Sequence, residues 1–173
     1  RMADVTPFPA PAPVGRRALV TGASGQLGRE LMRALPEAGF TVTGVDLPEV
    51  SISNAEQVAA LPWDDIDVVI NAAAWTNVDG AETPEGRRAT WQANSTGPAI
   101  LAREATAHGA TMVHISTEYV FDGTQDVHLE DEAPSPLGAY GQSKAGGDAA
   151  VASTPKHYIV RTSWVVGDGK NFL

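Results

Sequence analysis

Residues 17–35 read RALVTGASGQLGRELMRAL: a short apolar run, a glycine-rich turn, and a stretch of good helix formers. Gly22, Gly25 and Gly28 are spaced as GxxGxxG. A glycine turn between a strand and a helix lets backbone N–H groups approach a pyrophosphate, which the helix dipole favours. Asp46 ends the next apolar run, 18 residues beyond Gly28, near the spacing at which an acidic side chain binds a ribose diol. The segment predicts a dinucleotide site made by Gly22, Gly25, Gln26, Leu27, Gly28 and Asp46.

The alternation of a short apolar run with a helical stretch continues along the chain. The apolar runs, rich in Val, Ile and Thr, end at Thr21, Asp46, Asn71, Ser116 and Thr162, and helical stretches begin near Gln26, Asn54, Glu82 and Ala139. Strands that alternate with helices form a parallel sheet through right-handed crossovers, and such a sheet binds ligands at the carboxyl ends of its strands. The sequence therefore predicts an α/β fold with a doubly wound, Rossmann-like parallel sheet.

Two segments depart from this regular alternation. Residues 1–15 are rich in proline and alanine, which is typical of a linker or tail, so we expect the NAD(P)-binding domain to occupy residues 16–173. The helical region 82–108 is unusually long. Gly97 and Pro98 predict a kink or break inside it.

The composition limits the classes of function. The 21 acidic and 12 basic side chains give a formal net charge of -9, which excludes a nucleic acid or an anionic membrane surface as the main partner. The chain has no cysteine, and no apolar run approaches the roughly 18 residues of a membrane-spanning helix. Its histidines lack metal-ligand spacing. We therefore expect a cytoplasmic protein without a metal site.

A tyrosine and a lysine carry the predicted chemistry. Tyr140 and Lys144 stand four residues apart in YGQSK, at the start of a predicted helix, so both side chains project from one face. An ordinary phenol, with a pKa near ~10, is a poor acid–base group at neutral pH, but a neighbouring ammonium lowers that pKa. We expect Lys144 to lower the pKa of Tyr140 and to hold the ribose of a nicotinamide cofactor.

Two hydroxyl groups compete for the place beside Tyr140. Ser116 ends the fourth apolar run and Thr117 follows it. Because side chains alternate along a strand, only one of the two is expected to face the cofactor. Thr117 would hydrogen-bond the substrate oxygen that Tyr140 protonates. Asn94, in the long helical region, is expected to bond backbone near Lys144 and to support a relay water at the cofactor site.

An ordered series of segments resembles the extended short-chain dehydrogenase/reductases, and among them the dTDP-4-dehydrorhamnose reductases. The segments are TGASGQLGREL, VINAAAWTNVDGAE, VHISTEYVFDG, EDEAPSPLGAYGQSKAGGDAA and IVRTSWVVGDGKNF. The resemblance implies that NADPH or NADH reduces the C4 ketone of dTDP-4-dehydro-L-rhamnose, a dTDP-4-keto-6-deoxy sugar, to dTDP-L-rhamnose. It implies catalytic roles for Thr117, Tyr140 and Lys144, cofactor contacts at Asn71, Ala72 and Ala73, and substrate contacts at Thr76, Glu118, Tyr119 and Trp164.

The chain departs mildly from the pattern of that family. The family usually has Asp at the position of Glu118, Tyr at that of Trp75 and Glu at that of Asp148.

Two residues near the glycine turn have opposite preferences for the cofactor. Asp46 would repel a 2′-phosphate and favours NADH, whereas Arg29, just past the last glycine, can approach such a phosphate. The choice between NADPH and NADH therefore stays open.

Length and alternative functions complete the expectations. The family normally continues beyond the point where this chain stops, so we expect the substrate lobe to be largely missing and the chain alone to be poorly active. The proline-rich start suggests fusion to, or association with, an upstream enzyme of the pathway, and a homodimer is also expected.

Two alternative functions stay open. The chain could belong to another NAD(P)-dependent sugar-nucleotide epimerase or dehydratase, or to a non-catalytic regulatory homologue. Glu118 and Tyr119 after Thr117 favour reduction, because dehydratases usually have Asp-Glu there.

Overall fold

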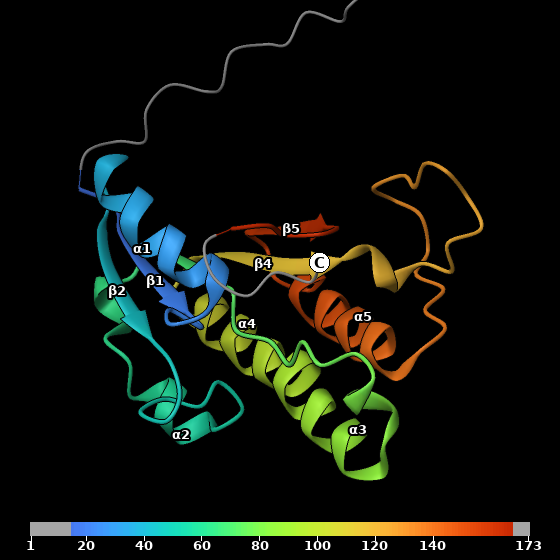
Figure 1. Cartoon of the computed structure of the whole chain (residues 1–173). Helices are drawn as coiled ribbons and strands as arrows, with labels where there is room; N and C mark the ends of the chain where they lie inside the picture. Colours follow the sequence, from blue (N-terminus) through green and yellow to red (C-terminus); the bar gives the residue numbers. More distant parts are fainter. Residues whose placement is uncertain (1–14, 168–173) are drawn as a thin grey trace, which may run out of the picture.

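The computed structural model describes residues 15–167, so segments 1–14 and 168–173, including most of the predicted linker, lie outside the described residues. Its five strands are β1 (Arg17–Thr21), β2 (Thr41–Val45), β3 (Val68–Asn71), β4 (Thr111–Thr117) and β5 (His157–Thr162). All neighbouring strands pair in parallel, in the order β2-β1-β3-β4-β5 (Figure 1). The predicted doubly wound sheet is confirmed.

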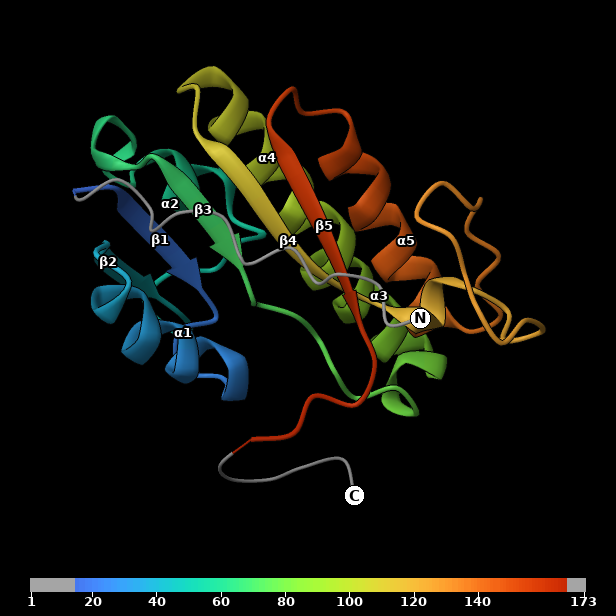
Figure 2. The ribbon, with the colours of Figure 1, turned by 90° about the horizontal axis from the view of Figure 1, so that it is seen from above.

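Helices cover both faces of this sheet. They are α1 (Gln26–Glu37), α2 (Ala55–Ala59), α3 (Pro84–Trp91), α4 (Gly97–Ala107) and α5 (Ala139–Ala152). Short 3-10 turns lie at Trp63–Asp65, Gly80–Glu82 and Glu118–Val120. Figure 2 shows α1 on one side of the sheet and α4 and α5 on the other. Within residues 15–167, no helix combines the length and the apolar composition that crossing a membrane requires.

The alternation of side chains along the strands gives the sheet two apolar cores. On one face Ala18 and Val20 of β1 pack in a cluster with Leu31 and Leu35 of α1. On the other face Leu19 belongs to a cluster formed with side chains from β3, β4, α2, α4 and α5, namely Val58, Val69, Leu101, Met112 and Val151. Each fully buried side chain of this size stabilises the fold by about 1.5–3 kcal/mol, so both layers of helices are fixed to the sheet.

The strand order reverses beside β1, and this point locates the ligand site. The chain passes from β1 outward to β2 and then returns to β3 on the other side of β1. A doubly wound sheet opens a crevice where its crossovers diverge in this way, at the carboxyl ends of the strands. The glycine turn 22–25 and the segment 72–78 therefore meet at this edge.

The helical region 82–108 is interrupted by a π-helical turn, whereas the sequence predicted a kink or break at Gly97 and Pro98. Helix α3 is capped by Thr83, whose Oγ1 accepts a hydrogen bond from the Gly86 amide at 3.0 Å. A π-helical turn (Gln92–Thr96) then joins α3 directly to α4. Pro98 lies in the first turn of α4, where a missing N–H is tolerated. Gly97 and Pro98 thus mark the start of a helix rather than a break within one.

Candidate active site

The glycine turn packs tightly against the segment that follows β3. Gly22 has a φ of 71°, and a Cβ atom added there would come within 2.6 Å of the Ala73 nitrogen. A Cβ atom on Gly28 would collide with the Gly22 carbonyl oxygen. Among residues 15–167, no side chain caps the amino end of α1, so the first turn of this helix presents backbone N–H groups to the cleft, as an anion site requires.

Replacing Gly28 by Ala tests the close approach of α1 to the turn. We expect the free energy of unfolding to fall by about 2 kcal/mol, because the new methyl group meets backbone that must shift. Urea denaturation measures this change. Gly39→Ala is the control for a glycine with open space around it, although its φ of 88° adds strain. Equal stability of Gly28→Ala and the unaltered chain would contradict the packing described.

Asp46 is fixed beside the same turn. Its Oδ2 accepts a hydrogen bond from the Ser24 amide and its Oδ1 one from the Leu47 amide, each at 2.8 Å. Arg29 donates from Nη1 to the Ser24 carbonyl at 2.7 Å. Asp46, which is expected to repel a 2′-phosphate, and Arg29, which is expected to attract one, therefore both bond the backbone of Ser24. The choice between NADPH and NADH stays open.

One cleft of about 520 Å³ gathers most of the predicted site residues. The predicted residues that line it are Gly25, Gln26, Leu27, Ala72, Thr76, Thr117, Glu118, Tyr119, Tyr140, Lys144 and Trp164. The predicted residues that do not line it are Gly22, Gly28, Asp46, Asn71, Ala73 and Asn94. The residues that the sequence prediction missed are Ala74, Val78, Ile115, Ser116, Thr162, Ser163 and Val165. Thr162 ends β5, so the rule that ligands bind at strand ends was a signal for it.

Tyr140 is held in its protonated form. Burial raises the pKa of Tyr140, and the charge of Glu118 raises it further, while a hydrogen bond with the Thr117 side chain acts to lower it. Lys144 is not among the groups that set this pKa. The predicted lowering of the Tyr140 pKa by Lys144 is therefore wrong for this structure, because burial is the largest influence on this pKa and Lys144 is not among the others. A protonated phenol is the form that can donate a proton to a ketone oxygen.

Lys144 is buried beneath the cleft and bound to the sheet. The residue is 2% exposed, and its Nζ donates to the Ile115 carbonyl of β4 at 2.6 Å. Burial lowers the pKa of Lys144 to about 8, while the charge of Asp148 acts to raise it. The ammonium group is therefore held in place by main chain of the neighbouring strand.

Thr117, rather than Ser116, is the hydroxyl that meets Tyr140, as strand alternation allowed. Thr117 Oγ1 donates to Glu118 Oε2 at 3.1 Å and accepts from the Tyr119 amide at 3.2 Å. Glu118 Oε1 in turn accepts from Ser163 Oγ at 3.1 Å. Ser116 Oγ is buried without a hydrogen-bond partner among the described residues. The hydroxyl in the cleft is thus oriented by a carboxylate that joins the ends of β4 and β5.

Asn94 acts on the site from behind rather than by lining the cleft. Its Oδ1 accepts from the Trp75 amide at 2.8 Å, and its Nδ2 donates to the Trp75 carbonyl and to Ser143 Oγ. Asn94 is fully buried, and it lies in the π-helical turn. It therefore ties Trp75, in the segment after β3, to Ser143 of α5. The predicted bonds to backbone near Lys144, the relay water and a direct cofactor contact stay predictions.

A chain of buried polar groups crosses the sheet beneath the cleft. Asn71 Oδ1 accepts hydrogen bonds from Thr21 Oγ1 at 2.7 Å and from the Ala73 amide at 3.2 Å. Its Nδ2 therefore faces His114 Nδ1, 3.0 Å away, as the donor of that bond. Burial, followed by the charge of Lys144, lowers the pKa of His114 to about 3. The imidazole is neutral at pH 7, with Nδ1 as acceptor and the proton on Nε2.

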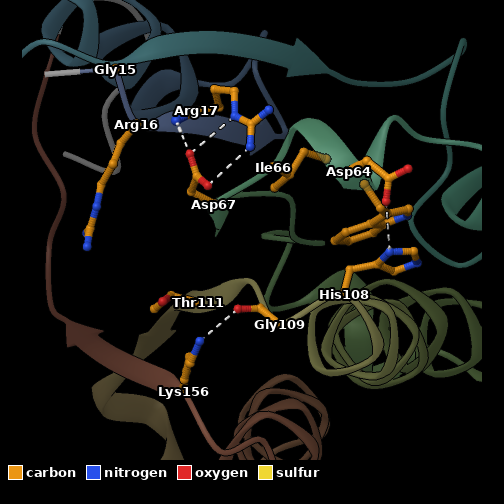
Figure 3. Close-up of a pocket in the computed structure, with 11 residues that line it drawn as sticks. Gly15, Arg16, Arg17, Asp64, Ile66, Asp67, His108, Gly109, Thr111 and Lys156 are labelled. Atoms are coloured by element: carbon orange, nitrogen blue, oxygen red, sulfur yellow. Dashed lines mark hydrogen bonds and ion pairs between the residues drawn. The ribbon is translucent and has the colours of Figure 1, made fainter. Parts of the chain in front are cut away.

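A second cavity, of about 570 Å³, lies at the opposite edge of the sheet. Figure 3 shows interactions between several of its lining residues: Arg17 with Asp67, His108 with Asp64, and Lys156 with the Gly109 carbonyl. The site residues predicted above are all absent from its lining. It lies away from the carboxyl ends of the strands, at the end of the sheet where β1 and β4 begin.

Sequence and fold both resemble known proteins. The family described as RmlD substrate binding domain matches residues 16–173. The chain is 40% identical over 166 residues to the dTDP-4-dehydrorhamnose reductase of Aggregatibacter actinomycetemcomitans, covering 91% of the chain and 54% of that relative. A crystal structure of the Clostridium acetobutylicum dTDP-4-dehydrorhamnose reductase has 42% identity and a TM-score of 0.83, covering 90% of this chain and 56% of the other. The Bacillus anthracis dTDP-4-dehydrorhamnose reductase in complex with NADP has 34% identity and a TM-score of 0.86, covering 93% and 58%. The chain spans about half the length of the curated relatives it matches.

Proposed function

Because the chain belongs to the RmlD substrate binding domain family, we propose that it is the dinucleotide-binding part of a reductase. The reductase uses NADPH or NADH to convert dTDP-4-dehydro-L-rhamnose to dTDP-L-rhamnose. The observation that carries the proposal is that Thr117, Tyr140 and Lys144 line one cleft together with Gly25, from the glycine turn. A proton donor and a dinucleotide turn on one cleft suit hydride transfer coupled to proton transfer.

The residues present fit a nicotinamide dinucleotide. The uncapped first turn of α1, with Gln26 and Leu27 lining the cleft, suits a pyrophosphate. Asp46, already oriented by two amides, would accept hydrogen bonds from a ribose diol, and Lys144 would hold the nicotinamide ribose. When bound, the cofactor supplies the hydride for the C4 carbon.

Tyr140 would supply the proton for the reduction, and Thr117 would position the oxygen that accepts it. Tyr140 stays protonated at neutral pH, because burial raises its pKa, and it would give its proton to the C4 oxygen. Thr117 lines the cleft with Tyr140, and its hydroxyl would donate to the same oxygen. In this structure that hydroxyl donates to Glu118, so it would turn from the carboxylate to the substrate, because a hydroxyl has one proton to donate.

Aromatic groups at the mouth of the cleft suit the sugar nucleotide. Tyr119 is 46% exposed and Trp164 59% exposed, and both line the cleft with Thr76 and Glu118. Exposed aromatic rings beside polar groups suit a ligand with an apolar face and hydroxyl groups. Substrate contacts at these four residues, association with an upstream enzyme, and a homodimer stay predictions.

Transfer of isotope from cofactor to sugar tests the proposal even if turnover is slow. The chain is incubated with NADPH or NADH that carries deuterium at the transferable position and with dTDP-4-dehydro-L-rhamnose, and the products are separated and weighed by mass spectrometry. We expect deuterium in dTDP-L-rhamnose. A new sugar nucleotide without deuterium would indicate an epimerase or dehydratase instead. Binding of cofactor without any product would indicate a regulatory homologue. Either outcome would contradict the proposed reduction.

A further inference from the structure

Helix α5 carries a third polar residue in line with the tyrosine and the lysine. Asp148 follows Lys144 by four residues, as Lys144 follows Tyr140, so the three side chains share one face of α5. Asp148 and Lys144 are each 2% exposed. A carboxylate is almost never buried to this degree unless it is paired. The groups around Asp148 therefore show what its burial serves.

The carboxylate of Asp148 is only partly satisfied. Its Oδ2 accepts a hydrogen bond from Arg161 Nε of β5 at 3.2 Å. Its Oδ1 has no hydrogen-bond partner among the described residues and lies 3.7 Å from His114 Nε2, which is also unpartnered there. Because His114 Nδ1 accepts the hydrogen bond from Asn71, the ring proton is on Nε2. The Nε2–H group therefore lies beside the carboxylate of Asp148. The carboxylate of Asp148 is thus bounded by Arg161 on one side and by the imidazole of His114 on the other.

The charge of Asp148 acts on Lys144 through the protein interior. The charged and titratable groups around Lys144 are Tyr140 and Asp148 on α5, His114 on β4, Arg161 on β5 and Glu118 at the cleft. Asp148 is the group whose charge favours the ammonium form, against the burial that disfavours it. Charges separated by protein rather than water interact strongly, so a single buried carboxylate can decide the protonation state of this lysine.

We propose that Asp148 is a positioning residue whose buried carboxylate keeps Lys144 as an ammonium ion, fixed on the Ile115 carbonyl in the cleft with Tyr140. The inference rests on the proposed function, since a charged Lys144 matters for holding the nicotinamide ribose. Without the carboxylate, the ammonium ion of Lys144, which is 2% exposed, would lose the one charge that acts to raise its pKa among the described residues. Lys144 would then lose its proton near neutral pH.

A direct titration of Lys144 tests this inference. The chain has three lysines, so NMR of protein with carbon-13-labelled lysine side chains follows each one, and Lys144→Met identifies the signal. In the unaltered chain we expect a midpoint of about 8. In Asp148→Asn we expect it to fall by about one pH unit or more, a tenfold loss of proton affinity. Asp148→Glu should restore the midpoint.

Variants that retain the carboxylate separate charge from packing. Arg161→Gln removes the hydrogen bond to Oδ2 but leaves the anion, so the Lys144 midpoint should not fall. An unchanged midpoint in Asp148→Asn would overturn the inference. If Asp148→Asn does not fold, a fall of a full unit in Asp148→Glu or Arg161→Gln would overturn it as well. Titration needs neither cofactor nor sugar, so a lack of isotope transfer by the unaltered chain would contradict the proposed function alone.

Discussion

Replacing Tyr140 by Phe is expected to reduce the rate of isotope transfer to the sugar by about 10²–10⁴-fold, the usual contribution of a positioned proton donor. The substitution removes the hydroxyl and leaves the ring, which packs edge-on against Tyr119 with centroids 5.8 Å apart. Fold stability and cofactor affinity should therefore change little. Single-turnover rates, measured with saturating cofactor, report the chemical step.

A second tyrosine provides the matched control. Tyr158 is 66% exposed on β5 and does not line the cleft. Tyr158→Phe makes the same chemical change outside the site, so its rate should equal that of the unaltered chain. If Tyr140→Phe transfers isotope as fast as Tyr158→Phe, Tyr140 is not the proton donor.

Acidification is expected to destabilise the fold through His114. An unfolded His takes a proton near pH 6.5, whereas burial keeps the folded His114 neutral down to about pH 3. Between these values the unfolded chain binds the additional proton, so stability is full above about pH 6.5 and is lost as the pH falls. The loss is about 1.4 kcal/mol per pH unit, or about 3 kcal/mol at pH 4.

His114→Gln isolates this contribution. The glutamine amide can still accept the hydrogen bond from Asn71 but does not titrate. Carboxylates whose pKa is lowered in the fold, such as Asp67 and Asp122, contribute to the acid sensitivity of the unaltered chain and of His114→Gln alike. The difference in unfolding free energy between these two proteins therefore reports His114. Urea denaturation at intervals from pH 7 to pH 4 gives the two curves. Parallel curves would mean that His114 is not buried as a neutral side chain.

Local patterns were enough to predict the sheet and most of the cleft. The apolar runs predicted the strand ends to within one residue. The central strands β1 and β3 are buried on both faces, and such parallel strands are continuous runs of Val, Ile and Leu. The rule that ligands bind at strand ends then brought Gly25, Thr117 and Tyr140 to one cleft. These inferences depend on spacing within a segment and on topology, both of which a sequence displays.

The features that the sequence did not predict depend on contacts between segments far apart in the chain. The pKa of Tyr140 is raised because burial outweighs nearby charge, and the depth of burial follows only from packing. The attachment of Lys144 to the Ile115 carbonyl, 29 residues away in sequence, has no local signature. Nor does the pairing of His114 with Asn71. Spacing alone suggested that Lys144 faces Tyr140, whereas the interior fixed it to the strand.

The π-helical turn at Gln92–Thr96 accommodates one more residue than an α-helical turn would hold. Deleting one residue from this turn would therefore let a regular helix run from α3 into α4, with Leu101 and Ala105 still packed in the core. The same deletion inside α4 would rotate every later residue by about 100° and carry Ala105 out of the core. Within this helical region, a change of length by one residue is thus tolerated at the turn and not in the helix that follows it.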